Sequence, residues 1–306
     1  MLHLFVINPV AGKLKISEKL TLVNEGINKL PESIRKKDEF LVYVTKDTMD
    51  ACKKVKQEAA NGKPLRVYAC GGDVTLNECV NAAAGRHNVA VTDFPCGTGN
   101  DFIKTFGEGK NSFSDITKLV TGKVKPLDLI LCNGRYSINI CSVGLDARVA
   151  EDVHNFSKRK ISTGAFDYAA CLALNVIKGT KSRMTATVDS LVCGPELNLV
   201  CVCNGRYYGG GFNPSPDARP DDGILDCLIV SGANRFSILR SIAAFSRGGY
   251  KKLPEYISYV RTNHIEVQAK SPQAVNLDGE IMKATRIVFD LIPEGVNFVI
   301  PEDIEF

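Results

Sequence analysis

The stretch LRVYACGGDVTLNE, residues 65–78, contains the local pattern that decides the fold of the first part of the chain. Residues 65–69 have the composition of a buried strand, two glycines then turn the chain, and a helix starts at Thr75. Glycines let backbone N–H groups approach phosphate oxygens, and the N-terminus of the following helix favours negative charge. The segment alone is equally compatible with an ordinary strand–helix turn in which Thr75 is the N-cap.

The same order of strand and helix extends to both sides of this stretch. Strand-like runs occupy residues 2–7, 40–45, 65–69 and 89–94, and helical patterns occupy residues 16–30, 48–60 and 75–84. Such alternation predicts a doubly wound parallel sheet with helices on both faces, and ligands bind at the carboxyl ends of such strands.

The pattern changes from about residue 123, where short strands dominate. We expect strands at residues 124–132, 136–143, 183–188, 197–203, 224–230, 264–269 and 287–291, interrupted by helices at 166–178 and 236–245. Turn-rich loops between short strands favour an antiparallel β-sandwich. We therefore predict an α/β domain over residues 1–125 and a β-sandwich over residues 126–291, with the active site in the cleft between them. The C-terminal residues 292–306 are expected to pack back on the first domain.

The composition is that of an ordinary globular protein. The 306 residues are 44% hydrophobic and 24% charged, with a net charge of +4. This charge is too small to indicate nucleic-acid binding, although it is compatible with attraction to an anionic membrane surface. No apolar run reaches the roughly 20 residues of a membrane-spanning helix. Residues 1–9 lack the features of a signal peptide, so a cytoplasmic protein is expected.

The 11 cysteines are odd in number and scattered, without a CxxC pair. The four histidines lie far apart in the sequence. This distribution indicates buried thiols and argues against both a disulfide framework and a zinc site.

Two more loops rich in small residues follow expected strands. NPVAGK at residues 8–13 lacks the first glycine and the Ser/Thr of a Walker A loop. PCGTGNDF at residues 95–102 has Phe102 at the third glycine position of a dinucleotide fingerprint. Three such loops at one sheet edge indicate phosphate binding without either common motif.

NPxxGK, GGDxTxNE and PxGTGNDF, in this order and spacing, resemble the diacylglycerol kinase catalytic family, which includes bacterial lipid kinases and sphingosine kinases. The similarity continues through NICSVGLD at 139–146, GGGFN at 209–213, PDDGIL at 220–225 and NLDGE at 276–280. It thus spans nearly the whole chain.

The resemblance implies transfer of the γ-phosphoryl group of ATP to a lipid hydroxyl, with a diacylglycerol-like lipid as the expected substrate. It is also compatible with a homodimer. By this resemblance, the residues that hold ATP are Asn8, Pro9, Val10, Ala11, Gly12, Lys13, Thr45, Gly72, Asp73, Val74, Thr75, Leu76, Asn77, Glu78 and Thr98.

The family's acid–base pair matches Asp278 and Glu280, and we expect Glu280 to act with the assistance of Asp278. A carboxylate accepts the hydroxyl proton while Mg²⁺ offsets charge on the phosphate. Taken alone, the Asp-Gly pair reads as a hairpin turn. A magnesium site is also implied, with the carboxylate of Asp222, the backbone carbonyls of Arg219 and Ile224, and Asp73 through water. The alternative there is a polar turn.

Residues 234–252 place basic side chains around an apolar helical stripe. Such a helix can lie on a membrane, which would give peripheral membrane contact, or it can pack against its own domain.

Val74 departs from the family pattern, which has glycine at this position. A β-branched residue resists positive φ and adds bulk to a tight loop. If the family's glycine approaches the nucleotide at this position, valine should obstruct the binding of ATP. The first alternative to an active kinase is therefore a non-catalytic binding protein of the same fold. The second is an NAD kinase-like enzyme, against which GTGNDF and the DGE turn argue.

Overall fold

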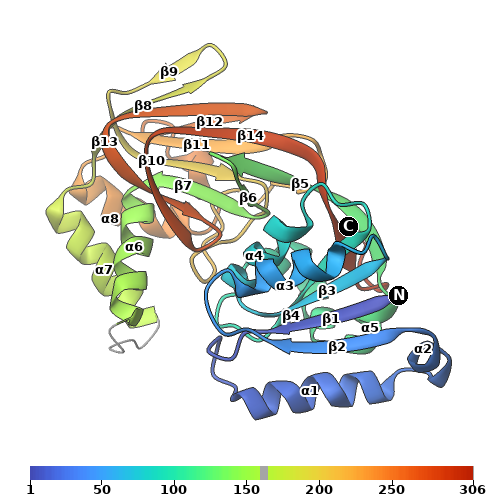
Figure 1. The fold of residues 1–306 in the computed structure, drawn as a ribbon. Helices are drawn as coiled ribbons and strands as arrows, with labels where there is room; N and C mark the ends of the chain where they lie inside the picture. The colour runs from blue at the N-terminus through green and yellow to red at the C-terminus, as the bar shows by residue number, and fades with distance from the viewer. Residues whose placement is uncertain (159–164, 306) are drawn as a thin grey trace. The chain divides into compact units, whose positions relative to one another are not determined.

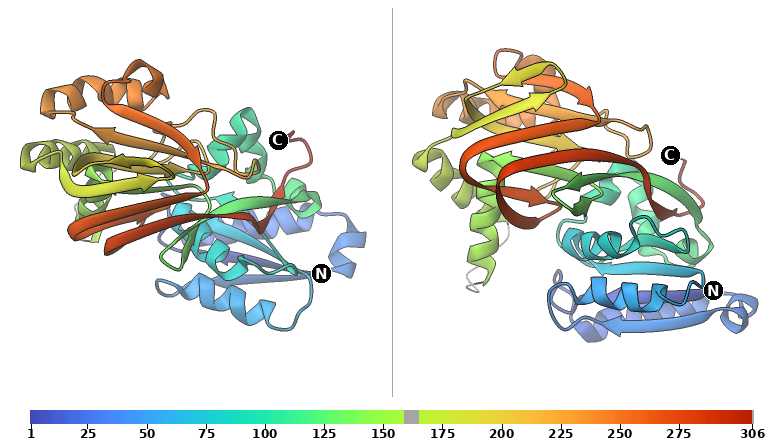
Figure 2. Two further views of the ribbon diagram at one scale, coloured as in Figure 1. Left: turned by 90° about the horizontal axis from the view of Figure 1, so that it is seen from above. Right: turned by 45° about the horizontal axis from the view of Figure 1, so that its top comes forward.

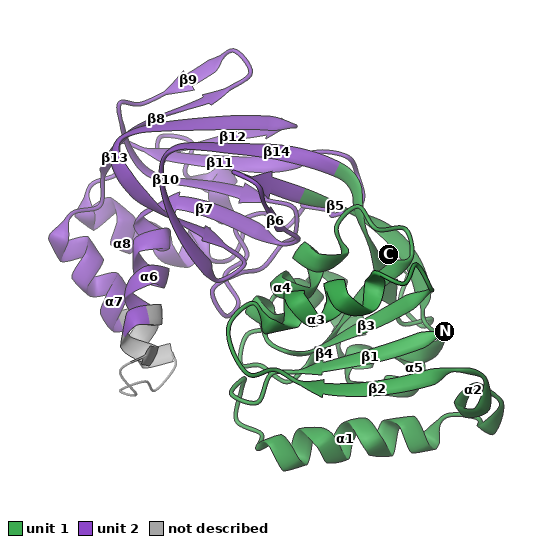
Figure 3. Ribbon diagram, viewed as in Figure 1, with its two compact units in different colours: residues 1–129, 293–306 green, residues 130–292 purple. Residues whose placement is uncertain are grey.

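The structure is a computed structural model that describes the backbone of residues 1–158 and 165–305 (Figure 1). Residues 1–129 and 293–306 form one compact unit, and residues 130–292 form a second (Figure 3). The chain passes between the units twice, in β5 (Lys123–Cys132) and in β14 (Glu280–Ile300).

The first unit is built on a parallel sheet in the order β4–β3–β1–β2. Its strands are β1 (Leu2–Ile7), β2 (Glu39–Val44), β3 (Leu65–Gly71) and β4 (Val89–Pro95). The end of β14 adds to this sheet, since Asn297 and Phe298 pair in parallel with Ala90 and Val91.

Helices cover both faces of this sheet, as the alternating sequence pattern predicted. α3 (Asp50–Ala59) packs with α4 (Asp73–Ala83) on one face, and α1 (Ile16–Lys29) contacts α5 (Ile116–Thr121) on the other (Figure 1). Two further elements complete the unit, the short α2 (Glu32–Lys37) and the 3₁₀ segment η1 (Phe102–Ser114). All seven residues of β3 are buried, which explains why this strand reads as an apolar run rather than an alternating one.

The second unit is antiparallel, in the order β12–β11–β10–β7–β13–β14. Its strands are the end of β5, β6 (Arg135–Ser137), β7 (Ile140–Gly144), β8 (Ser182–Val188), β9 (Leu191–Cys193), β10 (Glu196–Cys203), β11 (Leu225–Ser231), β12 (Ile257–Thr262), β13 (His264–Leu277) and most of β14. β8 pairs with both β10 and β13, so the strands fold over a shared apolar core.

Helices lie outside this core. They are α6 (Leu145–Lys158), α7 (Ala165–Lys178), α8 (Arg235–Phe245) and the short η2 (Gly249–Lys252). A second apolar cluster fills the space between the outer face of β10 and β11 and the segment that contains α8. The antiparallel character of this half was expected from its turn-rich sequence.

Two predicted strands were much too short. The expected strands 264–269 and 287–291 are parts of β13 and β14, which are 14 and 21 residues long. Figure 2 shows that both strands curve strongly along their length. Exposed polar residues and Pro272 interrupt the apolar pattern in this hairpin, which hid its length from sequence reasoning.

All eleven cysteines are free thiols and ten of them are buried, which confirms the interpretation of the cysteine pattern. Among the described residues, no helix has both the length and the apolar character needed to cross a bilayer.

Candidate active site

Three loops meet at the carboxyl edge of the parallel sheet in the first unit, and they are the three that the sequence singled out. A Cβ atom on Gly12 would lie 2.0 Å from the carbonyl oxygen of Cys96. A Cβ atom on Gly97 would lie 2.5 Å from Cα of Gly72. Gly12 and Gly97 are therefore required because one loop backbone touches the next, whether or not the turn itself needs glycine.

Side-chain hydrogen bonds join the first loop to α4. Asn8 Nδ2 donates to Thr75 Oγ1 at 3.1 Å, and Asn8 Oδ1 accepts from the Val10 backbone N–H at 3.1 Å. Gly71 makes room for this contact, since a Cβ atom there would lie 2.2 Å from Thr75 Oγ1. Thr75 is buried, so its hydroxyl helps to fix the loop.

Lys19 is a residue of this site that the sequence analysis missed. It is fully buried in α1, and its Nζ donates to the carbonyl oxygens of Asn8 at 2.7 Å and Ala11 at 2.6 Å. Burial lowers the pKa of the Lys19 ammonium. The available signal was a lysine on the otherwise apolar buried stripe of a helix, six residues after the NPxxGK motif.

The third loop holds the second in place. Asp73 Oδ1 accepts from the Asp101 backbone N–H at 2.6 Å. Asn100, at φ 42°, donates from Nδ2 to the Gly71 carbonyl at 3.0 Å and to Asp93 Oδ2 at 3.0 Å. Burial and the nearby Asp73 raise the pKa of the Asp93 carboxyl well above its ordinary value. The Asn-Asp pair of GTGNDF thus positions the GGD turn.

Val74 lies in the first turn of α4 and is not among the residues with positive φ. The position therefore imposes no left-handed backbone that would exclude a β-branched side chain. The Val74 side chain is partly exposed beside the N-terminus of α4. The backbone strain that the sequence pattern suggested is therefore absent. Val74 affects the loop only through the space that its side chain fills.

Several of the expected ATP-binding residues have their side chains directed into the protein. Glu78 accepts hydrogen bonds from the backbone N–H groups of Met49 at 2.7 Å and Ala51 at 3.2 Å, so it caps α3. Leu76 belongs to the core, and the oxygen of buried Asn77 accepts from Asn81. The Thr45 hydroxyl donates to the Ile7 carbonyl at 3.4 Å. By contrast, four of the expected residues are exposed at the loops: Val10, Gly12, Lys13 and Thr98.

The DGE segment of the second unit forms a two-residue hairpin turn between β13 and β14. Asp278 and Gly279 have φ values of 51° and 96°, and Leu277 pairs with Glu280, as in a type I′ turn. The buried Asp278 carboxylate accepts hydrogen bonds from Ser137 Oγ at 2.6 Å and from the backbone N–H groups of Ile138, Asn139 and Ile140 at 2.8, 3.2 and 2.9 Å. Asp278 therefore fixes the turn against residues 137–140.

Glu280 is the more open carboxylate of the pair. Its side chain is 17% exposed, and Arg135 Nη2 lies 3.9 Å from Glu280 Oε2. The two acidic residues of the motif thus differ in their surroundings, since donors fill the Asp278 carboxylate, whereas Glu280 is half-buried beside Arg135.

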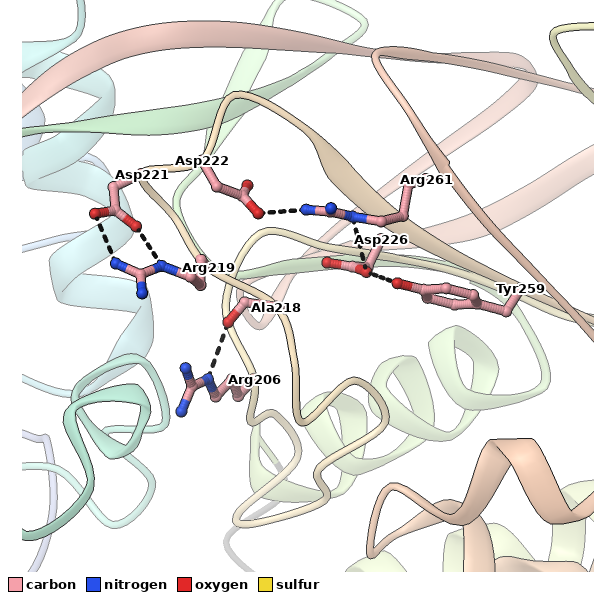
Figure 4. Close-up of polar contacts among 8 residues, drawn as sticks. All are labelled: Arg206, Ala218, Arg219, Asp221, Asp222, Asp226, Tyr259 and Arg261. Atoms are coloured by element: carbon pink, nitrogen blue, oxygen red, sulfur yellow. Dashed lines mark hydrogen bonds and ion pairs between the residues drawn. The ribbon is translucent and has the colours of Figure 1, made fainter.

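The predicted magnesium loop is a network of ion pairs (Figure 4). Arg219 binds Asp221 through two parallel hydrogen bonds of 3.0 and 3.1 Å. Arg261 contacts Asp222 through Nη2 and lies 3.7 Å from Asp226 through Nε. Tyr259 donates to Asp226, whose second carboxylate oxygen is buried and has no hydrogen-bond partner among the residues that the structure describes. Burial raises the pKa of Asp226.

These residues fit a divalent cation only in part. Carboxylate oxygens of Asp222 and Asp226 are suitable ligands for Mg²⁺. In this structure, however, Arg261 supplies the positive charge beside both carboxylates, so a cation at Asp222 would have to displace it. Within the described part of the chain, no group of three or more His, Cys, Asp or Glu side chains is placed to hold a metal. The ligand set of Asp222, Arg219, Ile224 and Asp73 stays a prediction.

An apolar pocket of about 90 Å³ lies in the second unit, between α8 and the outer face of β10 and β11. Its walls include Leu199, Tyr208, Val230, Ile238, Ile242 and Phe245, together with Asp146 at the start of α6. Burial raises the pKa of Asp146 to about 6, although the Ala147 backbone N–H donates to its Oδ1 at 2.8 Å. The Oδ2 atom of Asp146 is shielded from solvent.

Comparison with known proteins identifies these elements. Residues 3–132 match the model of the diacylglycerol kinase catalytic domain, and residues 139–300 match that of the YegS C-terminal NAD kinase beta sandwich-like domain. The chain belongs to the YegS-like lipid kinase family. The family predicted from the loop motifs is confirmed.

Curated relatives of this lipid kinase family are similar over most of their length. A putative lipid kinase of Staphylococcus haemolyticus is 28% identical over 85% of this chain and 84% of its own. A probable YegS-like lipid kinase of Shewanella frigidimarina is 28% identical over 77% of this chain and 76% of its own.

Solved structures share the fold of this family member. A putative diacylglycerol kinase of Bacillus anthracis superposes with a TM-score of 0.73 at 25% identity, covering 99% of this chain and 98% of that one. A second structure described as a putative diacylglycerol kinase of the same organism gives a TM-score of 0.72 at 26% identity.

The buried Lys19 provides a test of the loop architecture. Lys19→Met should lower the free energy of unfolding by about 2–3 kcal/mol, because it leaves the half-buried carbonyl oxygens of Asn8 and Ala11 without their donor. Urea unfolding followed by circular dichroism measures this change. Lys29→Met, on an exposed position of the same helix, should change stability by less than about 0.5 kcal/mol. Equal effects of the two substitutions would contradict the assigned role of Lys19.

Asp146 predicts a pH dependence of stability. Its pKa in the folded protein, about 6, lies above the ordinary value of 3.8, so the folded state binds the proton more tightly. This contribution to stability is complete below pH 4 and is lost as the pH rises to about 6. Asp146→Asn should therefore gain stability relative to the unaltered protein over this range, by at most about 3 kcal/mol.

Thermal or urea unfolding at pH values from 4 to 8 measures the gain. Asp47→Asn, at an exposed position, is the matched control and is measured at the same pH values. A stability difference for Asp146→Asn that is the same at pH 4.5 and pH 7.5 would exclude a raised pKa.

Proposed function

We propose that this chain is an active ATP-dependent lipid kinase that transfers the γ-phosphoryl group to the hydroxyl of a diacylglycerol-like lipid. The observation that carries the proposal is the close backbone contact of three loops at the N-terminus of α4. Gly12 and Gly97, where a Cβ atom would clash with the neighbouring loop, both lie at these contacts. The names of the relatives, which are putative or probable lipid kinases, support the same reaction class.

The loops offer a binding site for the phosphates of ATP. The carbonyl oxygens of Asn8 and Ala11 are turned toward the Lys19 ammonium, and this neutralises their negative ends inside the protein. The N-terminus of α4 adds the positive end of a helix dipole. The exposed Lys13 and Thr98 lie on these loops and are our candidates for direct phosphate contact. Asp222 and the carbonyls of Arg219 and Ile224 are our candidates for holding Mg²⁺, which would require Arg261 to leave Asp222.

Glu280 is the residue that we assign as the general base. A carboxylate accepts the proton of an attacking hydroxyl only if one of its oxygens is available, and Glu280 meets this condition. Asp278 is better assigned as a positioning residue, because four donors already occupy its carboxylate. Its hydrogen bonds to residues 137–140 hold the turn from which Glu280 starts β14.

The apolar pocket beneath α8 is our candidate for an acyl-chain site. Its volume of about 90 Å³ is well below the roughly 300 Å³ of typical ligand pockets, so α8 has to move outward to admit a chain. None of the eleven residues of α8 is fully buried, so such a movement has to break only partly buried contacts, such as those of Ile238 and Phe245 with the apolar cluster. Phe236 and Leu239 are 79% and 54% exposed on this helix. Together with Arg235 and Arg240 they would let α8 lie on a membrane surface.

A lipid panel tests the proposed reaction. The full chain, Mg-ATP labelled in the γ-phosphate, and mixed micelles of diacylglycerol, phosphatidylglycerol or a long-chain base should yield labelled lipid, with diacylglycerol the expected acceptor. Glu280→Gln should reduce kcat by roughly 10²- to 10⁴-fold with little change in stability. Asp278→Asn should reduce activity and also destabilise the fold by about 1–3 kcal/mol, because an amide nitrogen meets N–H donors.

The outcomes separate the proposal from its alternatives. A Glu280→Gln protein that keeps full activity would refute the base assignment. Transfer of phosphate to NAD but to no lipid would show an NAD kinase-like enzyme instead.

The partly exposed Val74 side chain, at the N-terminus of α4, is the observation behind a second candidate function, a binding protein without kinase activity. If valine is tolerated, the unaltered chain should show an ATP-dependent rise in melting temperature. Val74→Gly should then bind ATP with similar affinity and lose about 0.5–1 kcal/mol of stability, since glycine weakens a helix. Differential scanning fluorimetry with ATP measures both effects. A rise in melting temperature with ATP that appears only after Val74→Gly would show that the unaltered chain does not bind ATP, as expected of the non-catalytic protein.

A further inference from the structure

A basic hollow lies in the second unit, outside every motif that the function above uses. It occupies about 570 Å³ and is lined by the start of β8, the middle of β13, Lys283 of β14 and two residues of α6. Five of its lining residues are basic and one is acidic: Arg148, Lys181, Arg183, Lys270 and Lys283 against Glu151. We propose that this hollow binds a phosphate-bearing anion.

An irregularity in β13 creates the hollow. Gln268 pairs with Arg286 and Gln273 pairs with Ala284, so the residues 269–272 lie opposite Thr285 alone. Pro272 falls within this interruption, where a strand tolerates the loss of a backbone donor. The extra residues bulge out of the ladder and carry Lys270 and Ser271 to the wall of the hollow. Such a bulge redirects side chains toward a common point.

The positive charges are only partly compensated. Lys283 pairs with Glu151 at 2.7 Å, and Lys181 pairs with Glu196 at 3.4 Å. Within the described part of the chain, no carboxylate lies within ion-pair distance of Arg148, Arg183 or Lys270. Asp146 and Asp152 act on Arg148 from beyond that distance, whereas the exposed Arg183 and Lys270 can direct their charges to a ligand.

Arg148 gives the strongest single indication that the hollow binds a group with hydrogen-bond acceptors. It is half-buried at the base of α6, and Nη2 donates to the Gly179 carbonyl at 2.8 Å. Its buried Nε has no hydrogen-bond partner among the described residues. A guanidinium withdrawn from water with an unused donor is costly, and a phosphate oxygen is a strong acceptor for it.

The hollow faces away from the proposed catalytic carboxylate. Lys283 and Glu280 are three residues apart on β14, and alternate residues of a strand point to opposite faces. Met282 and Ala284 pack against the core on the side of Glu280, which leaves Lys283 on the outer face. The site is therefore separate from the DGE turn, although the same hairpin carries both.

The shared chemistry of the ligand is a phosphate group, which either a soluble anion or an anionic lipid headgroup supplies. Pyrophosphate titrated by calorimetry into the full chain tests the first source. Flotation with vesicles of phosphatidylglycerol in phosphatidylcholine, compared with pure phosphatidylcholine, tests the second. Both measurements are made in phosphate-free buffer at low salt, since screening weakens such contacts.

Arg183→Gln/Lys270→Gln is the test variant, because both side chains are exposed and their removal leaves the core intact. Lys29→Gln/Lys37→Gln, on the exposed surface of the first unit, removes the same charge as a control. We expect the test variant to lose affinity for pyrophosphate, or for the anionic vesicles, by roughly tenfold or more, while the control does not.

The pattern of loss identifies the source. Loss of pyrophosphate binding indicates a soluble phosphate compound, and loss confined to vesicle binding indicates a lipid headgroup. If the test and control variants, both with unchanged melting temperatures, retain equal affinity for pyrophosphate and for vesicles, the proposal is wrong. Pyrophosphate that binds only at the loops of the first unit would give this result, since neither substitution lies there.

Discussion

The candidate site of the first unit depends on backbone contact between loops that follow three different strands. The Gly12 loop touches the Cys96 carbonyl, and Gly97 touches Gly72, at distances that leave no room for a side chain on Gly12 or Gly97. The contacts require parallel strands in register, so that the loops leave the sheet at one level. They also require Lys19, which satisfies carbonyl oxygens that such close packing removes from water. A helix N-terminus with small residues around it is the result, and this is the surface that suits a phosphate.

Buried polar groups in this protein divide into those that are saturated and those that are not. Asp278 and Glu78 have their acceptors filled by backbone N–H groups, so they stabilise a turn and a helix start. Arg148 and Asp226 each keep an atom without a hydrogen-bond partner in the described structure. Carboxylates whose acceptors are all filled hold the neighbouring backbone in a fixed position. A buried polar atom without a partner is destabilising, and a ligand or an ion that binds to it removes this cost. This distinction separates Asp278 from Glu280 within a motif of three residues.

Local patterns predicted much of the fold. β1 has the predicted residues, and the two faces of the first sheet carry helices because apolar strands alternate with amphipathic helices. The long β13–β14 hairpin was not predicted, since its bulge and its polar outer face break the period that marks a strand. The placement of Val74 in the first turn of α4, where it does not have a positive φ, was also not predicted.

The order and spacing of the motifs, read from the sequence alone, determined the family and the α/β character of the first half. Those properties depend on residues close to one another in the chain, so the sequence pattern is enough to predict them. Tertiary structure alone decided which motif residues face the loops and which face the core, as in the contrast between exposed Thr98 and buried Glu78. It also decided that Lys19 supports the first loop and that basic residues from separate elements gather at one hollow. These facts depend on distances between residues far apart in the chain, and no local pattern records such distances.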